Sequence, residues 1–117
     1  MFRSDKEFFK HIFDEIFFLE SETEKLNEEM FLRDDKSQRA FARSIEIIGE
    51  AVKNLSNDVI LQNPQVKWRN IAGMRDKLIH GYFSVNNKLV WDVAKNVIPK
   101  FKKDLQDIKE RNPEKFG

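Results

Sequence analysis

Apolar residues recur at every third or fourth position across residues 35–55, the spacing of one face of an α-helix. On a helical wheel this apolar arc spans roughly 160°. An arc of that width exceeds what one packing contact requires, so the sequence predicts that this helix contacts a second subunit as well as its own core. The arc consists of Phe41, Ile45, Ile48, Val52 and Leu55, widened by Ala40, Ile47 and Ala51.

The N-terminal part of the chain predicts an earlier amphipathic helix. The residues Ser4 to Glu7 (SDKE) have the form of a capping box, so this helix is expected to begin at Ser4. Its apolar stripe runs from Phe9 to Leu19. An acidic connector is expected over residues 20–29, with a short helical turn within 27–33.

The C-terminal half predicts two more main helices. One is expected over residues 68–79, stopped by Gly81, because glycine suits the position that follows a helix. The last is expected from Lys88 onward, with a kink or break at Pro99, because proline lacks a backbone donor. Only 4 Gly and 3 Pro punctuate the 117 residues, too few for a many-stranded sandwich. The sequence therefore predicts an all-α, antiparallel bundle of four to five helices that forms one domain over residues 1–117.

Composition excludes several classes of site. The chain has no cysteine, and its two histidines, His11 and His80, belong to no metal-binding pattern, so neither a disulfide framework nor a metal is expected. No cofactor-binding motif is present. The lack of an apolar N-terminal segment and of any membrane-length apolar run predicts a cytoplasmic protein that does not bind membranes.

Charge is divided unevenly along the chain. Residues 1–35 hold 11 acidic and 5 basic residues, whereas residues 36–117 hold 9 acidic and 16 basic ones. A basic half suits binding of a polyanion, and it equally suits docking against the acidic half. Charge alone does not choose between these two uses.

Residues 74–83 (MRDKLIHGYF) are the segment in which chemistry is most plausible. On an ideal helix Arg75 falls inside the apolar arc, which is costly unless the guanidinium is paired or faces a polar cleft. Asp76 and His80 are four residues apart, so the carboxylate is placed to hold the imidazole. Histidine exchanges protons near neutral pH, and arginine binds phosphate through a planar fork.

The same residues also have a purely structural interpretation. Arg75 and His80 are separated by about 140° on an ideal helix and do not converge on one phosphate unless the helix unwinds near Gly81. In the structural interpretation His80 lies at the negative end of a helix dipole, Arg75 forms an internal ion pair and Tyr82 packs in the core. The spacing alone favours this interpretation.

A family resemblance favours the catalytic interpretation of these residues over the structural one. The pattern Arg75-x4-His80-x-Tyr82 resembles the motif of HepT-like toxins within the HEPN superfamily of ribonucleases. Residues 44–56 are similar to the long central helix of that family, and residues 68–83 are similar to its active-site helix. The matching segments follow one another in the family's order along nearly the whole chain.

The resemblance implies a homodimeric, HEPN-like, metal-independent endoribonuclease toxin encoded beside a nucleotidyltransferase antitoxin. By resemblance, Arg75 and His80 of both subunits line one cleft and cleave RNA, with Asp76 and Tyr82 in supporting roles. The antitoxin is expected to neutralise the toxin by transferring AMP to the hydroxyl of Tyr82. Two alternatives remain: a non-catalytic nucleotide-binding or scaffold partner of a nucleotidyltransferase, and a purely structural dimer.

Overall fold

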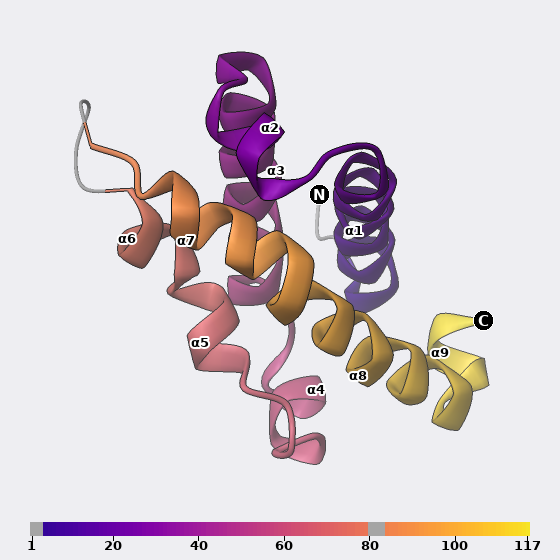
Figure 1. Cartoon of the computed structure of the whole chain (residues 1–117). Helices are drawn as coiled ribbons and strands as arrows, with labels where there is room; N and C mark the ends of the chain where they lie inside the picture. The colour runs from indigo at the N-terminus through magenta and orange to yellow at the C-terminus, as the bar shows by residue number, and fades with distance from the viewer. Residues whose placement is uncertain (1–3, 80–83) are drawn as a thin grey trace.

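Helices make up the regular structure of the chain. The computed structural model describes residues 4–79 and 84–117, and in these residues every element longer than a single bridge is a helix (Figure 1). The prediction of an all-α fold is therefore confirmed. The described residues divide into more elements than the four or five expected, because short helices connect the longer ones.

The first helix, α1 (Asp5–Lys25), begins where the capping box predicted. The Ser4 hydroxyl accepts a hydrogen bond from the backbone N–H of Glu7 at 3.2 Å. The helix then continues to Lys25, so the expected connector over residues 20–29 is wrong in its first part. Thr23 is buried there, and its hydroxyl donates to the Glu20 carbonyl at 3.0 Å, which satisfies a polar group that would otherwise oppose burial.

The long helix α3 (Asp35–Lys53) lies at the centre of the chain. The short α2 (Glu28–Leu32) precedes it, within the turn expected over residues 27–33. The helix α3 contacts α1, α2 and three later helices, so the same chain buries most of its wide apolar arc. Ala40 and Ile47 stay half-buried. The width of the arc is thus explained by packing on several sides of α3, and it is no longer evidence for a second subunit.

The helix expected over residues 68–79 is interrupted. After α4 (Asn57–Gln62), the chain forms α5 (Trp68–Ala72) and α6 (Met74–Leu78), with a turn at Gly73 between them. A close approach to α3 accompanies this break: a Cβ on Gly49 would lie 3.3 Å from the Ala72 carbonyl oxygen. Glycine at position 49 therefore lets the end of α5 pack directly against the backbone of α3.

The last long helical run changes to π-helical geometry before its proline. It consists of α7 (Asn87–Asp92), a π-helical segment η1 (Val93–Val97) and α8 (Ile98–Arg111). A proline at position 99 clashes with the carbonyl four residues earlier in an α-helix, and the wider π turn covers that position. The irregularity expected at Pro99 is therefore found one turn earlier, and the run continues without a break.

The short helix α9 (Pro113–Phe116), absent from the predicted elements, closes the core against α1. The rings of Phe116 and Phe9 stack with centroids 4.2 Å apart, and Lys115 Nζ lies 3.0 Å from Asp5 Oδ2. Burial raises the pKa of Asp5, but hydrogen bonds from Ser56 and Lys115 outweigh it and lower the pKa. The acidic N-terminal part and the basic C-terminal part are thus joined by ion pairs here and at Glu20–Lys102 (2.7 Å).

Candidate active site

Arg75 lies on the protein surface and is held by an ion pair. Its side chain is 46% exposed, so its expected place inside the apolar arc is wrong. The prediction failed because the turn at Gly73 removes the continuous helix on which the arc was drawn. Arg75 Nε donates to Glu46 Oε2 on α3 at 2.8 Å, which satisfies the requirement that such an arginine be paired.

Glu46 was missed by the sequence analysis. It lies within the apolar stretch of α3, next to Ile45 and Ile47, and a charged residue in that setting was the only available signal. Its other oxygen, Oε1, accepts from Arg43 Nη1 at 2.6 Å. Hydrogen bonds from Arg75 and Arg43 lower the pKa of Glu46, so the group is ionised at neutral pH.

Asp76 is highly exposed, and its described partner is Arg75. Asp76 Oδ1 lies 3.4 Å from Arg75 Nη1, a longer contact than that of Glu46. His80, Gly81 and Tyr82 lie outside the described residues. The expected pairing of Asp76 with the His80 imidazole therefore remains a prediction.

The backbone departs from helical geometry earlier than expected. The helix α6 ends at Leu78, and Ile79 is extended, with φ −119° and ψ 114°. Ile79 forms an antiparallel bridge with Val85, and the Asn86 N–H donates to the Leu78 carbonyl at 2.8 Å. The angle of about 140° between Arg75 and His80 applies only to an unbroken helix. The helix ends between them, so this objection to their convergence no longer holds.

A cleft with an apolar wall and a polar rim lies between α5 and the run from η1 to α8. Its volume is about 290 Å³, and Met74, the residue before Arg75, contributes to its wall. Lys67 and Lys100 also line it, together with the carboxamides of Asn70 and Asn96. Asp104 adds one carboxylate to the two lysines of this cleft. Phosphates bind lysine and base edges bind amides, so the lysines and amides are the groups here that suit an RNA strand.

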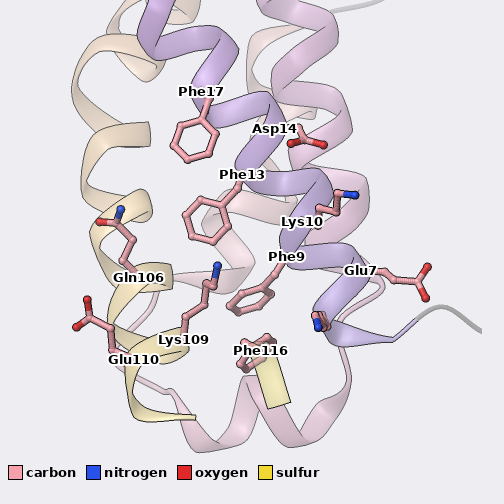
Figure 2. Close-up of a pocket in the computed structure, with 11 residues that line it drawn as sticks. Glu7, Phe9, Lys10, Phe13, Asp14, Phe17, Gln106, Lys109, Glu110 and Phe116 are labelled. Carbon is pink, nitrogen blue, oxygen red and sulfur yellow. The ribbon is translucent and has the colours of Figure 1, made fainter. Parts of the chain in front are cut away.

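An apolar groove lies on a different part of the surface. Figure 2 shows Phe9, Phe13 and Phe17 following one another along α1, with Lys109 of α8 reaching toward them. Lys109 Nζ lies 5.0 Å from the centre of the Phe13 ring. The groove encloses about 710 Å³, and neither Arg75 nor Asp76 lines it. Its rim carries three lysines and three carboxylates, so it has no excess of positive charge that would attract phosphate.

Two further kinds of site find no support in the described part of the chain. Within residues 4–79 and 84–117, no helix is long and apolar enough to cross a bilayer. In the same ranges, no cluster of three or more histidine and acidic side chains is arranged to hold a metal ion.

Comparison with known proteins identifies the family. A family model described as "Ribonuclease HepT-like" matches residues 12–108, a range that includes the motif from Arg75 to Tyr82. A candidate RNase of Caldanaerobacter subterraneus subsp. tengcongensis is 40% identical over 109 residues, which is 93% of this chain and 97% of that protein. A protein named "Probable ribonuclease HepT" from Thermococcus cleftensis is 41% identical over 94% of this chain and 100% of its own length.

A third relative matches more closely over a shorter range. A candidate RNase of Methanocaldococcus jannaschii is 50% identical over 78 residues, which is 67% of this chain and 64% of that protein. No solved structure matches the chain significantly. The family match over most of the chain and the nearly full-length relatives agree, and the chain belongs to the HepT-like ribonuclease family.

Proposed function

We propose that this chain is a metal-independent endoribonuclease toxin that cleaves RNA with Arg75 and His80. The observation that carries the proposal is the exposed guanidinium of Arg75, which is held by Glu46 of α3. Arg75 itself lies on α6, the helix that directly precedes the His80 segment. An exposed, oriented arginine is suited to bind a phosphate, whereas a buried ion pair would support only a structural role.

The reaction proposed is attack of an RNA 2′-hydroxyl on the adjacent phosphate. The 2′-oxygen forms a bond to phosphorus while the bond to the 5′-oxygen breaks, which yields a 2′,3′-cyclic phosphate and a 5′-hydroxyl end. One imidazole accepts the 2′-proton and another donates a proton to the leaving oxygen. Arg75 stabilises the negative charge that develops on the phosphoryl oxygens. Two acid–base groups are available if His80 from each of two subunits faces one cleft, so the proposal includes a homodimer.

Purified chain is expected to cleave single-stranded RNA in the presence of EDTA, because no step of the reaction uses a metal. The measurement is gel analysis of a labelled RNA, with detection of the cyclic phosphate on the products. Sedimentation of the same sample at micromolar concentration is expected to show a dimer.

A matched oligonucleotide with 2′-deoxyribose throughout is the control, and it should remain intact because it lacks the attacking hydroxyl. RNA that survives at high protein concentration would overturn the enzyme proposal in favour of a non-catalytic partner of a nucleotidyltransferase. Cleavage that stops on addition of EDTA would contradict the metal-independent route.

We also propose that a nucleotidyltransferase antitoxin switches the toxin off at Tyr82. The phenol oxygen attacks the α-phosphorus of ATP, pyrophosphate leaves and the phenolic proton is released. The attached AMP places a negative phosphate two residues from His80, where it competes with RNA for the same cationic groups.

Incubation with the cognate nucleotidyltransferase and ATP is expected to add AMP to the wild-type chain and to abolish its RNA cleavage. Intact-mass spectrometry measures the adduct, and Tyr82→Phe is the matched control because Tyr82 is the only tyrosine in the chain. Equal modification of the Phe variant, or full cleavage by the modified protein, would rule out the switch at this residue.

A further inference from the structure

Glu46 occupies a central place in the cluster around Arg75. It lies on α3, and its carboxylate bridges two arginines: Oε2 accepts from Arg75 Nε at 2.8 Å, and Oε1 accepts from Arg43 Nη1 at 2.6 Å. The Glu46 side chain is 26% exposed, much less than those of Arg43 and Arg75. The carboxylate is therefore the partly buried anchor, and the two guanidinium groups extend outward from it.

The contact at Nε determines where the rest of the Arg75 guanidinium points. A guanidinium is planar and rigid, so fixing the direction of its Nε–H bond also fixes the directions of its Nη donors. Nη1 makes the longer contact with Asp76 at 3.4 Å, and no contact formed within residues 4–79 and 84–117 engages Nη2. Among the described residues, Glu46 thus holds Nε and no acceptor occupies Nη2.

The charge on the cluster also favours an orienting role. A carboxylate paired with one arginine would cancel its charge, but Arg43 shares the Glu46 carboxylate, and the second carboxylate, that of the exposed Asp76, contacts Arg75 only at 3.4 Å. Glu46 therefore orients Arg75 while the guanidinium stays attractive to phosphate.

We propose that Glu46 is a positioning residue for Arg75, holding its guanidinium by Nε so that Nη2 faces the scissile phosphate of RNA. This inference rests on the proposed function, because it assigns Glu46 a role through the arginine of that reaction. It predicts that loss of Glu46 impairs the chemical step, since a displacement of about 1 Å in a catalytic group lowers rates substantially.

The test compares RNA cleavage by Glu46→Ala, Glu46→Gln and the control Asp35→Asn. The control removes the carboxylate of another arginine pair on α3, the exposed Asp35–Arg39 contact at 3.0 Å. Glu46→Ala is expected to lower kcat by up to about 100-fold. Glu46→Gln should lower it less, because it keeps an acceptor oxygen, and Asp35→Asn should match the wild type.

A double variant identifies the route by which Glu46 acts. In the Arg75→Ala background, Glu46→Ala should change cleavage by no more than about twofold, because the residue that it positions is already absent. Equal losses in both backgrounds would overturn the proposal. So would wild-type kcat in Glu46→Gln and Glu46→Ala, or a higher kcat, which would mean that the carboxylate masks Arg75.

A second readout does not depend on cleavage. NMR of the Arg75 Nε–Hε group, assigned by its loss in Arg75→Lys, is expected to show a proton protected from exchange in the wild type and unprotected in Glu46→Ala, which removes the acceptor. If the wild-type chain cleaves no RNA, the proposed function fails, and this signal then decides whether Glu46 holds the guanidinium. An unprotected wild-type proton would overturn the positioning role even if the chain is an active ribonuclease.

Discussion

Replacing His80 with alanine is expected to lower kcat for RNA cleavage by about 10²–10⁴-fold, the usual contribution of a general acid or base. Replacing Arg75 with alanine should lower kcat by about 10²–10³-fold, because charge on the phosphate is then poorly stabilised. Arg75 is exposed, so its removal should leave the thermal unfolding midpoint nearly unchanged. Both effects are measured with purified variants on a labelled RNA and, in cells, as relief of growth inhibition.

The matched control for Arg75 is Lys77→Ala. Lys77 is an exposed cation on the same short helix, two residues further along. Its removal should weaken RNA binding slightly without changing the chemical step. If Lys77→Ala reduced kcat as much as Arg75→Ala, the role of Arg75 would be reduced to general attraction of RNA. If the His80→Ala and Arg75→Ala variants both cleaved RNA at the wild-type rate, the catalytic assignment would be refuted.

Replacing Phe41 with alanine is expected to destabilise the fold by about 3–5 kcal/mol, the range found when a large aromatic side chain is removed from a core. Phe41 is fully buried on α3, and its ring centre lies 4.7 Å from that of Phe31 and 6.3 Å from that of Trp91. These rings come from three separate helices, so the cavity would open where α2, α3 and α7 meet. Urea unfolding followed by circular dichroism measures the loss.

Phe17→Ala is the control for this prediction. It removes the same number of atoms, but Phe17 is 50% exposed in the groove along α1. Its loss should cost much less, because little apolar surface returns to water and no cavity forms. Equal losses for Phe17 and Phe41 would show that the three-ring cluster is not the stabilising contact we describe.

The sequence predicted those features of the fold that depend on residues close together in the chain. The start of α1 was predicted because a hydroxyl cap and its receiving N–H are only three residues apart. The interruption at Gly73 was not predicted. It coincides with the close approach of Gly49 to the Ala72 backbone, and these two residues are far apart in the sequence. Apolar periodicity also gave no sign of how many neighbours would cover α3.

The candidate site was also predictable only in part. The motif identified Arg75 directly, but its true environment depended on Glu46, which is 29 residues earlier in the chain. The placement of Arg75 in an apolar arc was wrong because the calculation assumed an unbroken helix. The roles of His80 and Tyr82 remain predictions from the motif, and the variants described above test them.

The closure of α1 by α9 has a consequence for synthesis. Phe9 and Phe116 stack, yet they lie near opposite ends of the described chain, so the ribosome makes α1 long before the helix that covers it. Until α9 emerges, the Phe9 ring lacks the Phe116 ring that stacks on it, and exposed aromatic surface promotes aggregation of nascent chains. A product that terminates before Phe116 would keep the Phe9 ring exposed on that side. Loss of the last few residues would thus expose an aromatic ring that the finished chain buries.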